Sequence, residues 1–76
     1  MLTIKPKTQK LQTVRIKNGL STKKLAVKAK LNPLTILNIE NGLSAPNPST
    51  ASKICTALGV GFDDIFELVD EKKAGV

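Results

Sequence analysis

The sequence predicts an all-α fold made of five short helices around one core. Apolar residues recur at helical spacing in five segments, short turn signals separate these segments, and strand-like alternation is absent beyond the first few residues. A chain of 76 residues fits one hydrophobic core, with no room for a second domain. We therefore expect a helical domain over residues 8–69, an N-terminal arm or short strand over residues 1–7, and a flexible tail over residues 70–76.

The first two helices are indicated by their ends. Residues 8–17 are compatible with a helix, and the pair Asn18-Gly19 is typical of a left-handed C-terminal cap. Ser21 is well placed to cap a second helix over residues 22–29, because its hydroxyl can accept a hydrogen bond from the first turn. The inner face of this helix is narrow and consists of Leu25, Ala26 and Ala29.

Two Asn-Pro pairs begin the third and fourth helices. Asparagine caps a helix well, and proline is preorganised for the first helical turn. Asn32-Pro33 therefore predicts a helix over about residues 33–41, which stops at Gly42. Asn47-Pro48 predicts the next helix, whose core residues follow the spacing i, i+3, i+4, i+7: Ala51, Ile54, Cys55 and Leu58.

The same spacing predicts a fifth helix with an apolar stripe of Phe62, Ile65, Phe66 and Val69. Two aspartates in its first turn agree with the helix dipole, which favours negative charge there. Phe62, Phe66 and Val69 form a candidate dimer surface. The alternative is that both phenylalanines belong to the core, and we expect this more for Phe62 than for Phe66.

Charge is distributed unevenly along the chain. The net charge is +6, from 12 basic and 6 acidic residues. Every basic residue except Lys72 and Lys73 lies within residues 1–53, where Glu40 is the one acidic residue. This pattern favours a polyanionic partner and leaves the acidic C-terminal third for protein contact. Lysine-rich helices also serve simply to make a small protein soluble, so charge alone does not decide the function.

The segment from Ser21 to Gly42 is the most informative one. Its two short helices are joined by only a few residues and must cross steeply, and Ala26 is the small residue at the crossing. Motifs in and around this segment occur in a specific order: Arg15, Gly19-Leu20-Ser21, Leu25-Ala26, Ile36, Ile39-Glu40-Asn41-Gly42, Ala57-Leu58-Gly59-Val60 and Asp64-Ile65-Phe66. With these motifs, residues 11–66 resemble the Cro/cI-type (XRE-like) helix-turn-helix family, which implies a compact five-helix, lambda-repressor-like DNA-binding domain.

The resemblance also implies roles for individual residues. The second helix would lie over the phosphate backbone, and the third would enter the major groove of double-stranded DNA. Residues implied to read bases are Asn32, Pro33, Leu34, Leu37 and Asn38. Asn38 is the best of these readers, because its amide can bind adenine through two hydrogen bonds. Residues implied to contact phosphates are Thr22, Lys23, Thr35, Asn41 and Ser44. Arg15 and Glu40 match a structural ion pair between the first and third helices.

The sequence departs from this family in two places. Lys30 occupies the turn position usually held by glycine, and a left-handed backbone there would cost lysine roughly 1 to 2 kcal/mol. The readout face is apolar, with Pro33, Leu34 and Leu37 where polar side chains are usual. These leucines can contact thymine methyl groups, or they can pack against a partner protein or the N-terminal segment. The sequence is compatible with both alternatives.

We therefore expect a sequence-specific DNA-binding transcriptional regulator of bacterial, phage or mobile-element origin. Repression is its expected effect, and a palindromic operator bound by a homodimer is its expected site. The alternative is an antitoxin-like or antirepressor-like protein-interaction module. The chain has no histidine and a single cysteine on an apolar stripe, so we expect no enzyme activity, metal or cofactor. It has no signal-like apolar run, so we expect a cytoplasmic protein without a membrane partner.

Overall fold

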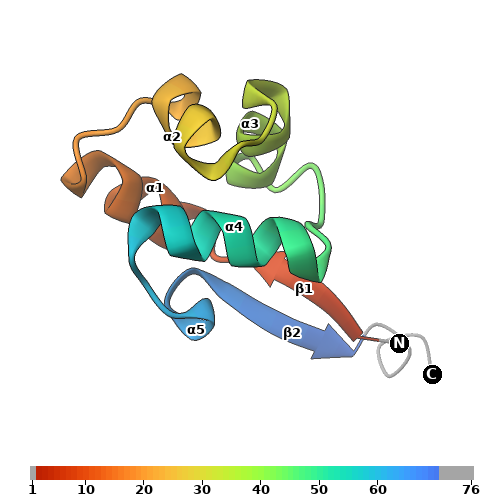
Figure 1. Ribbon diagram of the computed structural model, residues 1–76. Coiled ribbons are helices and arrows are strands. Elements are labelled where there is room, and N and C mark those ends of the chain that lie inside the picture. Colours follow the sequence, from red (N-terminus) through yellow and green to blue (C-terminus); the bar gives the residue numbers. More distant parts are fainter. Residues whose placement is uncertain (1, 71–76) are drawn as a thin grey trace.

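Five helices and a two-stranded sheet make up the computed structural model, which describes residues 2–70 (Figure 1). The helices are α1 (Thr8–Lys17), α2 (Thr22–Ala29), α3 (Pro33–Glu40), α4 (Pro48–Leu58) and α5 (Phe62–Ile65). The strands are β1 (Leu2–Pro6) and β2 (Phe66–Asp70). The first four helices lie where the cap signals in the sequence predict them.

Side-chain caps explain where three of these helices begin. Ser21, Asn32 and Asn47 precede α2, α3 and α4, and the side chain of each accepts a backbone N–H from the first turn at 2.8–3.1 Å. Each cap satisfies a donor that the helix itself leaves unpaired. At the other end of α3, Gly42 adopts a φ of +72°, which a residue without Cβ accepts without strain.

The core lies between the helices and the inner face of the sheet. Its largest fully buried side chains come from all five helices and from β2: Leu11, Leu25, Ile36, Ile39, Ile54, Ile65 and Phe66. Ile4 of β1 is 8% exposed and closes the core on the side of the sheet. Every helix is thus held by at least one fully buried branched side chain, and α3 is held by two.

The all-α prediction is incomplete because the chain contains a small sheet. Strands β1 and β2 pair antiparallel, with Leu2 opposite Asp70 and Pro6 opposite Phe66. The predicted fifth helix therefore ends after one turn, at Ile65. Residues 66–69 also alternate in a strand-compatible way. Pairing them with residues 2–6 satisfies backbone groups on both segments, which outweighs continuation of the helix.

This change reverses the expected burial of the two phenylalanines. Phe66 has no exposed surface, whereas Phe62 is half-buried and packs against the core with its ring centroid 5.6 Å from that of Phe66. Of the three candidate dimer residues, only Phe62 and Val69 thus retain accessible surface. Asp70, predicted to begin the tail, belongs to β2. The rest of the predicted tail, residues 71–76, lies outside the described residues.

Candidate nucleic-acid interface

A tight turn joins α2 to α3 and fixes the angle between them. Lys30 ends α2 in the left-handed conformation, with φ 59° and ψ 44°. The N–H of Leu31 then donates to the carbonyl oxygen of Ala26 at 2.8 Å, which closes the Schellman type of helix end. Ala26 itself is fully buried, so its small side chain allows the close approach of neighbouring elements. The segment from α2 to α3 is therefore a rigid elbow.

Helix α3 is anchored to the core by one face and leaves the opposite face free. Ile36 and Ile39 point inward and are at most 1% exposed. Leu34 and Leu37, which lie one helical turn apart on the other side, are 60% and 45% exposed. Asn38 is half-buried beside them. We call Leu34, Leu37 and Asn38 the outer face of α3.

The two remaining predicted base-reading residues lie at the start of α3. Asn32 and Pro33 are both exposed. The Asn32 Oδ1 atom accepts the N–H of Leu34 at 2.8 Å, so this side chain caps the helix. Asn32 therefore has a structural role in addition to any contact with a base.

The residues predicted to contact phosphates come from the start of α2 and from α3 and the loop after it. Lys23, Asn41 and Ser44 are exposed, while Thr22 and Thr35 are half-buried. Thr22 is the first residue of α2, where free backbone amides and the helix dipole favour an anion. Exposed lysines continue along α2 and into the turn: Lys23, Lys24, Lys28 and Lys30.

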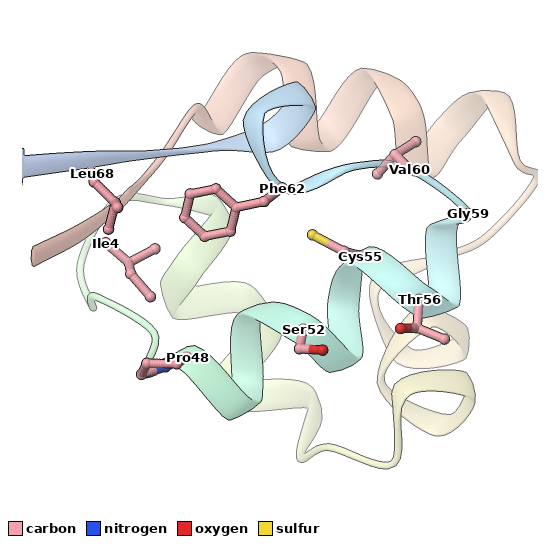
Figure 2. Close-up of a pocket in the computed structure, with 9 residues that line it drawn as sticks. All are labelled: Ile4, Pro48, Ser52, Cys55, Thr56, Gly59, Val60, Phe62 and Leu68. Atoms are coloured by element: carbon pink, nitrogen blue, oxygen red, sulfur yellow. The ribbon is translucent and has the colours of Figure 1, made fainter.

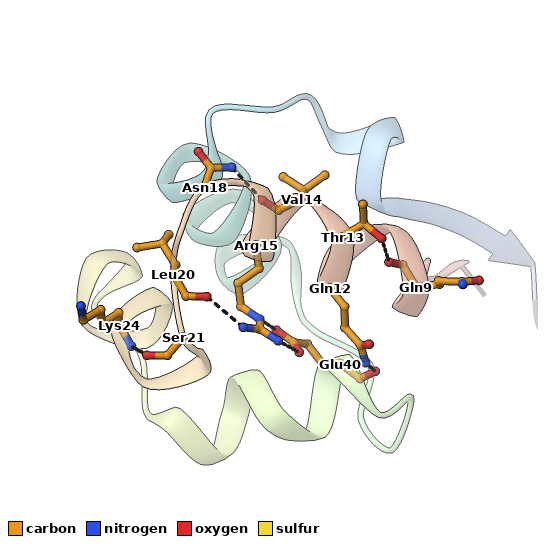
Figure 3. A network of polar contacts seen from close by, with 10 residues as sticks. All are labelled: Gln9, Gln12, Thr13, Val14, Arg15, Asn18, Leu20, Ser21, Lys24 and Glu40. Carbon is orange, nitrogen blue, oxygen red and sulfur yellow. Dashed lines mark hydrogen bonds and ion pairs between the residues drawn. The ribbon is translucent and has the colours of Figure 1, made fainter.

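Arg15 and Glu40 form a bidentate ion pair between α1 and α3 (Figure 3). Arg15 Nε donates to Glu40 Oε2 at 2.6 Å, and Arg15 Nη2 donates to Glu40 Oε1 at 3.1 Å. The third guanidinium nitrogen, Nη1, donates to the carbonyl oxygen of Leu20 at 2.9 Å, before the start of α2. One arginine thus links α1, the α1–α2 loop and α3, which is a positioning role.

One member of this network, Gln12, was not predicted from the sequence. Gln12 Nε2 donates to the backbone oxygen of Glu40 at 3.2 Å and so supports the C-terminal end of α3 (Figure 3). Gln12 lies three residues before Arg15, so both project from neighbouring positions on α1. This spacing of three residues is the signal in the sequence that could have revealed Gln12 as a partner of α3.

Leu43 was also not predicted from the sequence as a surface residue of this region. Leu43 follows α3 and is 75% exposed.

An apolar pocket of about 610 Å³ lies between α4 and the sheet (Figure 2). Ile4, Leu68 and Phe62 line one side of it, and the sulfur atom of Cys55 points into it from α4. Burial raises the pKa of the Cys55 thiol, and the negative charge of Asp64 raises it further. A neutral thiol is a poor nucleophile and a poor metal ligand, so Cys55 serves here as an apolar lining residue.

The described residues contain no alternative centre for a metal ion. Within residues 2–70, no three side chains of the His, Cys, Asp and Glu types gather in a way that could hold one. In the same range, every helix is too short or too polar to cross a membrane.

Comparison with known families identifies the fold. Residues 11–65 match the family model described as helix-turn-helix, and this match covers most of the chain. The chain belongs to the helix-turn-helix family. The resemblance to the Cro/cI-type (XRE-like) branch, predicted from the motifs between Arg15 and Phe66, is confirmed. Two short helices joined by a tight turn, as in α2 and α3, are the arrangement that defines a helix-turn-helix motif.

Three solved structures with the same fold are a restriction-modification controller and two transcriptional regulators. The restriction-modification controller protein C.AhdI from Aeromonas hydrophila is 26% identical, with a TM-score of 0.71 over 75% of this chain and 86% of that chain. A helix-turn-helix transcriptional regulator from Vibrio cholerae is 28% identical, with a TM-score of 0.69, and the match covers 75% of this chain but only 32% of that regulator. The clp gene regulator ClgR from Corynebacterium glutamicum, 23% identical with a TM-score of 0.67 over 75% of this chain and 74% of that chain, shares the fold. Comparison with curated proteins finds none that matches the sequence.

Proposed function

We propose that this chain is a sequence-specific DNA-binding regulator of transcription that inserts α3 into the major groove. The observation that carries the proposal is the free outer face of α3. Leu34 and Leu37 are exposed although the opposite side of the same short helix is sealed into the core. A helix held rigidly by one face and presenting the other is what major-groove recognition requires.

The charge around the elbow supports a DNA partner. The exposed lysines of α2 and its turn surround the site with positive charge. Glu40, the one acidic residue within residues 1–53, is 4% exposed and is neutralised by Arg15. Phosphates of DNA would thus meet lysines, the amides at the start of α2 and the polar residues Thr22 and Ser44, without an opposing carboxylate.

We further propose that the protein acts as a homodimer on a palindromic operator and represses transcription there. Two copies of α3 would then lie about 34 to 36 Å apart, one helical turn of DNA. Phe62 and Val69 are the accessible members of the candidate dimer surface, and Leu68, which lines an apolar pocket together with Phe62, is 57% exposed. Leu68→Glu should therefore shift a dimer toward the monomer in analytical ultracentrifugation, and an unchanged dimer would place the interface elsewhere.

A second candidate function is an antitoxin-like or antirepressor-like module that binds another protein. It is favoured by the apolar character of the exposed residues Leu34, Leu37 and Leu43. Salt dependence separates the two functions. DNA binding through lysines should weaken steeply with salt, with a log–log slope of roughly −0.9 per phosphate neutralised, whereas apolar protein contact should not.

Selection of binding sites from a random pool of DNA duplexes tests the main proposal. The expected result is one enriched palindrome whose half-sites are one helical turn apart. The Leu37→Glu variant, with a carboxylate on the outer face of α3, should enrich nothing. Ile16→Glu is the matched control, because Ile16 is a similarly exposed apolar residue on α1, and this variant should enrich the same palindrome as the parent protein. Recovery of no motif by the parent protein would contradict the proposal.

A further inference from the structure

The outer face of α3 offers apolar side chains where DNA readers commonly offer hydrogen bonds. Given the proposed function, on which this step rests, we infer that Leu34 and Leu37 form a site for the 5-methyl groups of pyrimidines. The protein would then distinguish thymine and 5-methylcytosine from uracil and unmethylated cytosine. The affinity for DNA would then depend on whether a cytosine in the site is methylated.

The chemistry of the major groove leads to this ligand class. Among the four standard bases, the C5 methyl of thymine is the one apolar group on a major-groove edge, and the other groups there are hydrogen-bond donors and acceptors. A leucine placed over a donor or acceptor removes water without replacing its hydrogen bond, which is unfavourable. Placed over a methyl group, the same leucine buries apolar surface on both partners. In 5-methylcytosine, a methyl group occupies the same ring position as in thymine.

The spacing of the two leucines indicates how many bases they address. Leu34 and Leu37 are separated by three residues, which is about 4.5 Å along a helix axis. The bases of one DNA strand are separated by about 3.4 Å. The two side chains are thus matched to neighbouring base pairs. Asn38 follows Leu37 on the same face, so we expect a half-site in which two adjacent pyrimidines with 5-methyl groups lie next to a base read by an amide.

Charge indicates that DNA, rather than an apolar protein surface, covers these leucines. Lys23, Lys28 and Lys30 are exposed on the adjoining helix α2 and its turn. Within residues 2–53 no carboxylate is exposed, because Glu40 is buried against Arg15. A partner must therefore combine small apolar groups with dense negative charge around them. Thymine methyl groups flanked by two phosphate backbones meet both requirements.

Replacement of single thymines tests the inference at the level of one methyl group. The operator obtained by selection is resynthesised with deoxyuridine at one thymine at a time, and the Kd of each duplex is measured by fluorescence anisotropy at fixed salt. At one or two thymines in each half-site, loss of the methyl group should weaken binding by about fourfold, the factor expected for burial of one such group. At the same positions, a 5-methylcytosine–guanine pair should bind about fourfold more tightly than a cytosine–guanine pair.

Protein variants assign each methyl group to a side chain. Leu34→Asn and Leu37→Asn keep the side-chain size and remove its apolar character, so each should abolish the deoxyuridine effect at one position and preserve it at the other. Ile16→Ala, on α1, should preserve the effect at both positions. Circular dichroism checks that each variant is folded.

The possible outcomes separate this inference from the proposed function. If selection enriches a palindrome but deoxyuridine binds as well as thymine at every position, the methyl-reading inference is overturned and the DNA-binding proposal stands. Selection of a half-site without thymine would likewise overturn the methyl-reading inference and leave the DNA-binding proposal standing. If selection enriches no motif, both are overturned.

Discussion

Arg15 on α1 and Glu40 at the end of α3 are joined by two side-chain hydrogen bonds, of 2.6 Å and 3.1 Å. The Glu40 carboxylate is 4% exposed and the Arg15 side chain is 15% exposed, so the pair is largely shielded from water. Because Arg15 also donates to the carbonyl oxygen of Leu20, the pair orients α3 relative to both α1 and the start of α2. The outer face of α3 depends on this orientation.

Removal of one partner of this pair should destabilise the protein strongly. Arg15→Ala leaves the Glu40 carboxylate buried and unpaired, and we expect the free energy of unfolding to fall by about 3 kcal/mol in urea denaturation. The double variant Arg15→Met/Glu40→Leu removes both charges and should recover most of this loss. A single variant as stable as the parent protein would mean that the pair is not a structural link.

The left-handed turn at Lys30 predicts an unusual gain in stability. Its φ of 59° is strained for lysine and unstrained for glycine. We expect Lys30→Gly to raise the Tm by roughly 2 to 6 °C, since part of the gain is offset by the greater freedom of glycine in the unfolded chain. Lys28→Gly is the matched control: it removes the same charge inside α2 and should lower the Tm. A clear drop in Tm for Lys30→Gly would contradict the left-handed turn.

The buried thiol of Cys55 predicts a pH dependence of stability. Its pKa is raised in the folded protein by burial and by Asp64, while the unfolded chain should show the usual thiol pKa of about 8.5. The unfolded state therefore loses the proton first. The contribution to stability is complete below about pH 8.5 and is lost as the pH rises from there through the folded-state pKa. Urea denaturation at pH 7.5 and 9.5 should show this decline in the parent protein. Cys55→Ala should show a smaller decline, and an equal decline in both would contradict the prediction.

Thr22 should contribute affinity without sequence preference. It is the first residue of α2, beside the cap residue Ser21, and under the proposed function its hydroxyl donates to a phosphate. Thr22→Ala should weaken binding to specific and unrelated duplexes by a similar factor. Gel-shift titration with the selected operator and a scrambled duplex measures both. A change confined to one base pair would instead make Thr22 a base reader.

Local signals in the sequence were sufficient to predict the first four helices. Ser21, Asn32 and Asn47 each make the cap hydrogen bond that their residue type predicts. These interactions span two or three residues, so they are readable from the chain alone. The outer face of α3 was predicted for the same reason, since the burial of Ile36 and Ile39 determines which side chains point outward.

The C-terminal strand was not predictable from local pattern. Phe62, Ile65, Phe66 and Val69 fit a helical stripe, yet Phe66 and Leu68 also alternate as in a strand. Which of the two forms depends on pairing with β1, whose paired residues lie 60 to 68 positions earlier in the chain. Periodicity contains no information about such a partner. The roles of individual residues in binding DNA were inferred from family resemblance, and they remain predictions.

Asn38 provides the most direct test of the claim that α3 reads bases in the major groove. Base preference at every operator position is measured for the parent protein and for Asn38→Ala, with circular dichroism as the check on folding. For Asn38→Ala, base preference should relax at one base pair in each half-site, by about 1 to 3 kcal/mol, and be retained elsewhere. A folded Asn38→Ala protein with unchanged preference at every position would contradict the claim.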